Sequence, residues 1–450
     1  MSPAERPLWQ RFLVFLVPMM AANVLQSLSG TINNIYVGQL LGVEALASVS
    51  VFFPIMIFLI SFIIGLSSGA TVLIGQAWGA RNTEKVKQVT GTTLTVAFFG
   101  GVVIAILGLL FTEQIMTVLG APPNILPTAT AFGRIMLLGM PGMFVFLVVT
   151  SVLRGVGDTI TPLVSLGISI AVGLVVTPAL ILGWFGLPQI GVMAAAVATI
   201  SGFMLVLIFL FFYMRARKHP LAPDAVLLRN LRIDPGVLKL ILRLGIPAGV
   251  QMIVTSVAAI VVVGLVNRYG SNATAAYGAV NQVLSYVQFP AMSIAIAASI
   301  FGAQAIGAGR IDDLGNITRT ALILNLIITG GLILIAYVFS EHLVALFITR
   351  PEVIELTQQL LHIVLWSVVL FGAAAVLSGI MRASGVVLVP MLISLGAIAL
   401  VELPTAIAVS QMIGLHGIWW GFVASFSVML LAQTLYYRLF WMKKEIVALV

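Results

Sequence analysis

The chain has 450 residues, of which 61% are hydrophobic and only 8% are charged, and its mean hydropathy is +1.17. An average soluble domain carries about 25% charged residues, so this composition excludes a soluble globular protein and predicts a polytopic membrane protein. The sequence has no cysteine, which excludes disulfides, thiolate metal sites and cysteine nucleophiles.

Apolar stretches with almost no charge recur along the chain, each long enough as a helix to cross roughly 30 Å of hydrocarbon. We therefore predict an all-α fold. The first stretch is longer than a signal-peptide core and has no convincing small-residue cleavage site, so we expect an uncleaved first span. Twelve transmembrane helices are predicted, at residues 11–37, 43–72, 90–112, 126–152, 160–184, 187–214, 242–267, 272–303, 317–340, 354–380, 388–410 and 415–438.

Most of the 22 Lys and Arg residues lie at the two termini and in the connections that follow the even-numbered spans. The connections on the other side hold only Arg268 and Arg350. By the positive-inside rule we expect both termini to be cytoplasmic.

The longest hydrophilic stretch, residues 215–236, contains three prolines and divides the chain into halves of six spans. We predict an N-terminal lobe at residues 1–214, a cytoplasmic linker at 215–236 and a C-terminal lobe at 237–450. Seven residue pairs coincide when the halves are shifted by 228 residues, which predicts a parallel repeat with a pseudo-two-fold axis along the membrane normal. The pairs are Gly42 and Gly270, Gln76 and Gln304, Gly79 and Gly307, Arg154 and Arg382, Gly157 and Gly385, Pro162 and Pro390, and Gly186 and Gly414.

Two such lobes leave a cleft near the membrane midplane that can open to either side, which favours transport over catalysis. The chemistry of an intramembrane enzyme is missing from the sequence. The four histidines form no i, i+4 pair for a metal. The G-x-S-x-G pattern from Gly65 to Gly69 lies in an apolar helix, where small-residue packing is expected. We predict no enzyme, no metal and no cofactor.

Five motifs resemble those of the multidrug and toxic compound extrusion (MATE) family over nearly the whole chain. They are "GQAWGARN" (residues 75–82), "GAQAIGAGR" (302–310), "VLRGVGDTITP" (152–162), "IMRASGVVLVP" (380–390) and "LGIPAGVQ" (244–251). The resemblance implies twelve spans in two parallel lobes. It also implies export of amphipathic, often cationic, small molecules across the inner membrane in exchange for protons or sodium.

The resemblance also places Asn33 where many bacterial members carry an aspartate whose protonation bends the first span at a proline fifteen residues earlier. That proline is present here as Pro18. Asparagine takes up no proton near neutral pH, so Asn33 is not expected to couple transport to a proton. Other acidic positions of the family hold Thr177, Thr255 and, in the tenth span, a residue near Phe371.

Glu402 is the one Asp or Glu that lies well inside a predicted span. A carboxylate at a helix centre costs at least roughly 2.5–3.5 kcal/mol, so it marks a functional site by default. Pro404 frees the carbonyl of Leu400 beside it. Glu402 is our ion-coupling candidate. The alternative is a structural residue, protonated or paired with Arg134, the one basic residue deep in a predicted span.

Neutral polar residues of the predicted spans are candidates for lining the substrate cleft: Asn33, Asn34, Thr177, Gln251, Thr255, Asn281 and Gln282. Hydrogen bonding between helices of one lobe is the alternative for each of them. The hinge candidates are Pro18, Pro178 and Pro404. Trp419 and Trp420 are expected to anchor the last span at the membrane interface.

Two other functions stay open at this point. The chain could move a lipid-linked or anionic substrate, as flippases of the wider superfamily do, although those commonly have a cavity rich in arginine. It could also be a membrane scaffold that transports nothing. The expected partners are a small-molecule substrate, a coupling proton or sodium ion and the lipid bilayer, with no nucleic acid. The self-contained repeat predicts a monomer.

Overall fold

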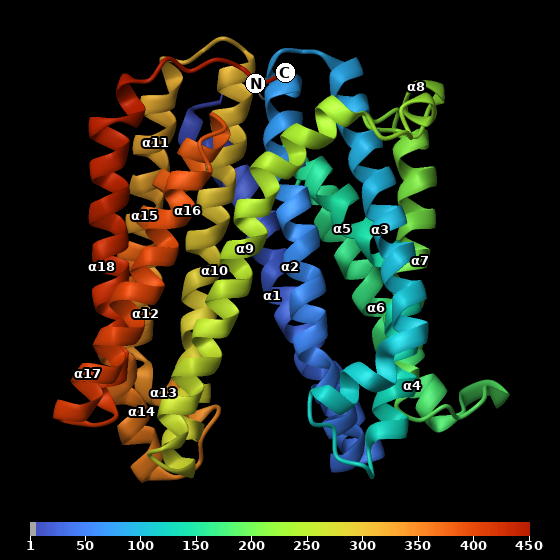
Figure 1. The fold of residues 1–450 in the computed structure, drawn as a ribbon, viewed down its shortest axis with the longest axis vertical. Helices are drawn as coiled ribbons and strands as arrows, with labels where there is room; N and C mark the ends of the chain where they lie inside the picture. Colours follow the sequence, from blue (N-terminus) through green and yellow to red (C-terminus); the bar gives the residue numbers. More distant parts are fainter. Residues whose placement is uncertain (1–5) are drawn as a thin grey trace. The chain divides into compact units, whose positions relative to one another are not determined.

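The structure is a computed structural model that describes residues 6–450, and those residues form helices and no strand (Figure 1). Eleven helical stretches are long and apolar enough to cross a membrane. A bent pair, α4 (Leu126–Leu138) and α5 (Met140–Gly155), with 50° between its members, makes twelve if it counts as one span. The prediction of an all-α protein with twelve spans is confirmed.

The other spans of the first half are continuous helices. They are α1 (Leu8–Leu41), α2 (Val43–Gly79), α3 (Thr83–Val118), α6 (Ile160–Leu182) and α7 (Met193–Ala216). The second half opens with two equally continuous spans, α9 (Pro235–Asn267) and α10 (Ser271–Gly307), and closes with α18 (His416–Leu439).

The remaining three spans of the second half are interrupted. One consists of α11 (Asp313–Leu324), the π-helical η3 (Asn325–Thr329) and α12 (Gly330–Val338). The next joins α14 (Pro351–Val364) to α15 (Val368–Ala383) through the 3-10 turn η4 (Leu365–Ser367). The third consists of α16 (Leu388–Gly396), the π-helical η5 (Ala397–Glu402) and α17 (Leu403–Ile413).

The backbone repeats with the sequence. Three of the glycine pairs that are 228 residues apart adopt the left-handed conformation at matching turns, where a side chain would be strained. Their φ angles are 90° and 92° for Gly42 and Gly270, 96° and 84° for Gly157 and Gly385, and 78° and 72° for Gly186 and Gly414. The conserved offset therefore reflects a shared turn geometry in the two halves.

The chain forms two compact units. The N-unit comprises Ala21–Trp78 and Asn82–Ile246. The C-unit comprises the described residues up to Met20, the short segment Gly79–Arg81, and Pro247–Val450. Because these boundaries fall inside α1, α2 and α9, each of these three helices contributes residues to both units.

In the N-unit, α2 and the start of α9 approach each other through glycines. A Cβ atom on Gly69 would lie 2.3 Å from the carbonyl oxygen of Ile241, and one on Gly245 would lie 2.4 Å from that of Gly65. The G-x-S-x-G pattern thus serves close helix packing, as its position in an apolar helix predicted.

The segment at residues 215–236 packs against α3 of the same unit. Asp224 caps the short helix α8 (Ala225–Arg229) and also forms an ion pair with Lys87. Asp234 accepts a hydrogen bond of 2.8 Å from the side-chain amide of Gln88. The predicted linker is therefore fastened to one unit in the structure.

In the C-unit, the beginning of α1 packs on α10. The rings of Phe12 and Phe15 lie 4.7 and 5.4 Å from that of Phe301, centroid to centroid. Farther along, α10 contacts α14 and α15, and α15 contacts α18. These helices bury two apolar cores, one of which is centred on Trp419 and the residues of α10 and α14 around it.

The π-helical turn η3 has a polar residue at its start that is satisfied inside the protein. Asn325 is buried, donates a 3.0 Å hydrogen bond to the carbonyl oxygen of Val369 and accepts one of 3.1 Å from the Thr329 hydroxyl. A Cβ on Gly372 would lie 2.1 Å from the Asn325 side-chain oxygen. This turn therefore joins α11 to α15 through a fully bonded amide, which explains its position without a ligand.

Candidate functional site

The second π-helical turn, η5, ends at Glu402. Pro404 follows in the first turn of α17 and has no N–H to donate to the carbonyl of Leu400. A π turn is a common way of inserting such a break into a membrane helix, and π turns occur frequently at functional sites. The sequence thus places a proline and a carboxylate at one irregular turn of the span.

The Glu402 side chain points into the C-unit, where it is 6% exposed. The Ser425 hydroxyl of α18 faces this carboxyl and makes no hydrogen bond to any other described residue. A Cβ on Gly421 would lie 2.7 Å from the backbone oxygen of Glu402, so α18 can approach η5 this closely only because position 421 has no side chain.

No ion pair compensates this carboxylate. Among residues 6–450, no Lys, Arg or His side chain lies within ion-pair distance of Glu402. Arg134, the partner that the sequence offered, belongs to the N-unit and lies 3.9 Å from Glu113 of α3. The alternative of a Glu402–Arg134 pair is therefore wrong.

Tyr277 of α10 is the nearest titratable neighbour. It interacts electrostatically with Glu402 and exchanges a hydrogen bond with Asn281, one turn along its own helix. The Tyr277 ring lies 5.5 Å from that of Trp419, which is completely buried and whose indole N–H has no partner among the described residues. The expectation that Trp419 anchors the membrane interface is wrong, because it packs inside the unit; Trp420 is exposed.

A row of aromatic rings continues from this point. Trp419 lies 5.6 Å from Phe422, which lies 6.3 Å from Phe426, and Phe426 lies 5.1 Å from Phe371 of α15. Ser425 stands beside Phe426 in the sequence of α18. The carboxyl of Glu402 thus belongs to a neighbourhood of aromatic rings with a few neutral hydrogen-bonding groups.

The other predicted site residues are distributed over the two units. Asn281 is brought to Tyr277, and so to the surroundings of Glu402. Thr255 donates a 2.9 Å hydrogen bond to the carbonyl oxygen of Gln251 in its own helix. Gln282 is half-buried on α10. Nothing in their contacts assigns a ligand to the latter three residues.

In the N-unit, Thr177 is buried beside Pro178 in an unbroken α6. Asn33 is half-buried and Asn34 is exposed on α1. The proline candidates lie inside helical spans as predicted, Pro18 in α1, Pro178 in α6 and Pro404 in α17. Their role as hinges stays a prediction.

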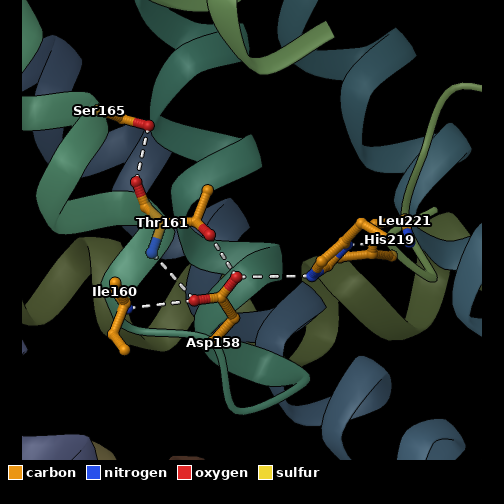
Figure 2. Close-up of polar contacts among 6 residues, drawn as sticks. All are labelled: Asp158, Ile160, Thr161, Ser165, His219 and Leu221. Carbon is orange, nitrogen blue, oxygen red and sulfur yellow. Dashed lines mark hydrogen bonds and ion pairs between the residues drawn. The ribbon is translucent and has the colours of Figure 1, made fainter. Parts of the chain in front are cut away.

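A separate titratable pair lies at the turn between α5 and α6 (Figure 2). The Asp158 carboxyl accepts hydrogen bonds of 3.1 Å and 3.0 Å from the backbone N–H groups of Ile160 and Thr161, and one of 2.5 Å from the Thr161 hydroxyl. It also lies 3.5 Å from Nε2 of His219. The Leu221 N–H donates to Nδ1 of His219, which leaves Nε2 to carry the ring proton toward Asp158.

Burial of Asp158 acts to raise the pKa of its carboxyl, but the hydrogen bonds from His219 and Thr161 outweigh it and hold that pKa below its ordinary value. The carboxylate is therefore ionised at neutral pH. It caps α6 and fastens the end of the 216–221 turn. We interpret this pair as structural, because all of its members bond to one another.

The comparisons with known proteins agree with this architecture. The MatE family model matches residues 18–179 and 247–408, one copy in each half. The chain is 46% identical to "Probable multidrug resistance protein YoeA" of Bacillus subtilis, over 98% of this chain and 96% of that protein. It is 23% identical to "Multidrug export protein MepA" of Staphylococcus aureus, over 96% and 94% of the two chains.

Among solved structures, a mutant of the MATE transporter VcmN from Vibrio cholerae superposes with a TM-score of 0.89, at 21% identity and 98% coverage of both chains. This likeness concerns the fold. Together with the matches in sequence, it confirms the resemblance that the motifs indicated. The chain belongs to the MatE family of multidrug efflux transporters and is a multi-pass membrane transporter, not an enzyme.

Proposed function

We propose that this transporter exports amphipathic organic cations by antiport with protons or sodium, and that Glu402 is the group for which substrate and coupling ion compete. The supporting observation is the burial of Glu402 without a basic partner, beside a row of aromatic rings. Both termini lie in the cytoplasm in this proposal, because the basic residues gather on their side of the sequence.

The chemistry follows from the cost of a charge in a low-dielectric site. A buried carboxylate is stable when it is protonated or when a cation neutralises it. A proton, a sodium ion and an organic ammonium group can each do this, and occupation by one disfavours the others. Such exclusive occupancy of one carboxyl is the simplest basis for exchange.

The aromatic rings suit the proposed substrate class. An ammonium group within about 6 Å of a ring centroid is attracted to the ring face, most strongly to tryptophan. Tyr277 and Trp419 supply such rings close to Glu402, while Phe422 and Phe426 extend the apolar surface. A flat amphipathic cation fits these groups better than an anion, for which the described surroundings of Glu402 supply no positive charge.

The first half of the chain offers no equivalent carboxylate. Asn33 and Thr177 occupy the positions where the family resemblance would place acids, and neither titrates near neutral pH. Coupling through Glu402 therefore moves the ion-linked step to the C-unit.

The test is accumulation of a fluorescent organic cation in inverted membrane vesicles under an imposed proton gradient and, separately, a sodium gradient. Glu402→Gln keeps the size and hydrogen-bonding capacity of the side chain but removes its charge and its titration. We expect the natural chain to accumulate the probe and Glu402→Gln to lose gradient-driven accumulation. Glu355→Gln, which removes an exposed carboxylate of the same unit, should behave as the natural chain does.

Equal accumulation by Glu402→Gln and the natural chain would contradict the role of Glu402. Silence of both, with the protein present in the membrane, would contradict the organic-cation substrate and favour a lipid-linked or anionic one. Comparing the two gradients identifies the coupling ion.

A further inference from the structure

A cavity of about 490 Å³ opens within the C-unit, far along the chain from Glu402. It lies between the start of α1, the end of α10 and the first turns of α11. Three arginines line it, together with a single carboxylate and several neutral hydrogen-bonding side chains: Arg11, Arg310, Arg319, Asp313, Asn316 and Thr320.

The cavity has an excess of positive charge. Arg310 lies 3.5 Å from Asp313, so these two charges compensate each other. Arg11 is held with its guanidinium 5.5 Å from the centre of the Phe301 ring. Within residues 6–450, neither Arg11 nor Arg319 has a carboxylate at ion-pair distance. Two guanidinium groups therefore remain for an anion, and guanidinium is well suited to phosphate oxygens.

The wall formed by α11 continues into a surface that faces lipid. Ile323 lines the cavity one turn after Arg319 and is exposed, and Ile327, a further turn along, is exposed as well. Residues four apart lie on one face of a helix. Since Asp313–Val338 is long and apolar enough to span a membrane, exposed isoleucines on it are expected to face acyl chains.

We propose that this cavity binds the phosphate group of an anionic phospholipid, with an acyl chain lying along Ile323 and Ile327. One phosphate between Arg11 and Arg319 would join the start of α1 to α11. A free phosphate anion shares the headgroup chemistry but would leave the apolar strip unused. This site is separate from the cation site at Glu402 and does not depend on the proposed antiport.

The experiment is native mass spectrometry of the detergent-purified full chain, titrated with phosphatidylglycerol, phosphatidylcholine or inorganic phosphate. We expect one phosphatidylglycerol to be retained in preference to phosphatidylcholine. Removing one surface basic residue corresponds to a loss of about fivefold in affinity. Arg319→Gln should therefore weaken retention by about fivefold, and Arg11→Gln with Arg319→Gln by about 25-fold.

Two variants control for charge and for folding. Arg438→Gln removes an exposed arginine of the same unit that does not line the cavity, and should retain the lipid as the natural chain does. Arg319→Lys keeps the charge and should lose less than Arg319→Gln. Because Arg11 packs on Phe301, its variant is compared only if its thermal midpoint is unchanged, and Arg319→Gln provides the test otherwise.

Equal retention of phosphatidylglycerol by Arg319→Gln and the natural chain would overturn the proposal. So would inorganic phosphate that displaces the lipid at equal concentration, because the source of the anion would then be soluble. Vesicle transport does not enter this measurement, so its outcome is distinct from that of the Glu402 experiment.

Discussion

The same span of the repeat is constructed differently in the two halves. In the first half it is α6, a regular helix in which Thr177 is buried beside Pro178. In the second half it is the α16–η5–α17 span, whose helix widens into a π turn that ends at the buried Glu402. A common ancestral span thus has an inert version and a version with a carboxylate, which teaches that the two lobes of this transporter need not share its chemistry.

A second comparison points the same way. Residues 325–329 of the second half form the π turn η3 around Asn325, whereas the repeat-related position in the first half, Ala97, lies in the unbroken helix α3. Both π turns of the described chain contact helices that carry the aromatic row, η3 on α15 and η5 on α18. The irregular backbone is therefore concentrated in the lobe that holds Glu402.

The largest expected effect tests whether the two versions of this span differ in function. Glu402→Gln should reduce gradient-driven transport by about 100-fold or more, because the only buried carboxylate of the span is lost. Thr177→Ala, at the related place in α6, should change transport by less than about threefold. The measurement is the initial rate of probe accumulation in inverted vesicles at equal protein content. A comparable loss in both variants would mean that the lobes contribute symmetrically.

The next effect concerns the contact between α18 and η5. Gly421→Ala should destabilise the protein by about 1–3 kcal/mol, because the new Cβ would be forced against the Glu402 backbone oxygen. Gly396→Ala is the matched control. Its Cβ would meet nothing within 4 Å, so it should be neutral or slightly stabilising. Thermal midpoints in detergent measure both, and equal midpoints would show that the close approach is dispensable.

A smaller effect concerns the turn between the fourth and fifth spans of each half. Asp158 caps this turn in the first half, whereas the second half has Val386 at the related place. Because the pKa of Asp158 is lowered on folding, its contribution is present at neutral pH and is lost as the pH falls through its folded-state value, below about 4.

Asp158→Asn should therefore open the 216–221 turn by about 1 kcal/mol, which is roughly fivefold faster amide exchange at pH 7. The natural chain should show the same loosening only in acid, after correction for intrinsic exchange rates. The turn around Val386 provides the internal reference, because it has no carboxylate to protonate. Loosening of both turns to the same extent in acid would contradict the assignment to Asp158.

Much of the fold could be predicted because membrane spans are written in composition. Charge-free stretches gave twelve spans, and the repeat followed from glycines whose turns require a left-handed backbone, such as Gly42 and Gly270. Glu402 could be singled out for the same reason, since a carboxylate inside a span is costly and rare. Its burial is confirmed, while its role in coupling stays a proposal.

The surroundings of Glu402 could not be predicted. A span that is apolar on every side has no amphipathic phase, so the sequence does not tell which face of α18 points inward, and Trp419 was assigned to the interface. The π turn at residues 397–402 shifts the helical phase without any mark in composition. The spacing of Tyr277 and Asn281, one turn apart on α10, was a signal that could have linked a tyrosine to the predicted polar position.

The smallest effect tests a turn that both halves adopt with different residues. Arg81 has φ of 57° after α2, and Gly309, 228 residues later, has φ of 72° after α10. A side chain in the left-handed region costs about 1–2 kcal/mol, part of which glycine returns through its greater freedom in the unfolded chain. Arg81→Gly should therefore stabilise by about 0.5 kcal/mol, and Gly309→Ala should destabilise by about 1 kcal/mol.

These shifts correspond to roughly 1–2 °C in thermal midpoint for a chain of this size. Arg81→Ala removes the charge but keeps the strained backbone, so it should not stabilise. If Arg81→Ala raised the midpoint as much as Arg81→Gly, charge rather than backbone strain would be the difference between the two turns. Otherwise the first half carries a small strain that the second half has relieved, in a repeat whose chemistry has diverged in the opposite direction.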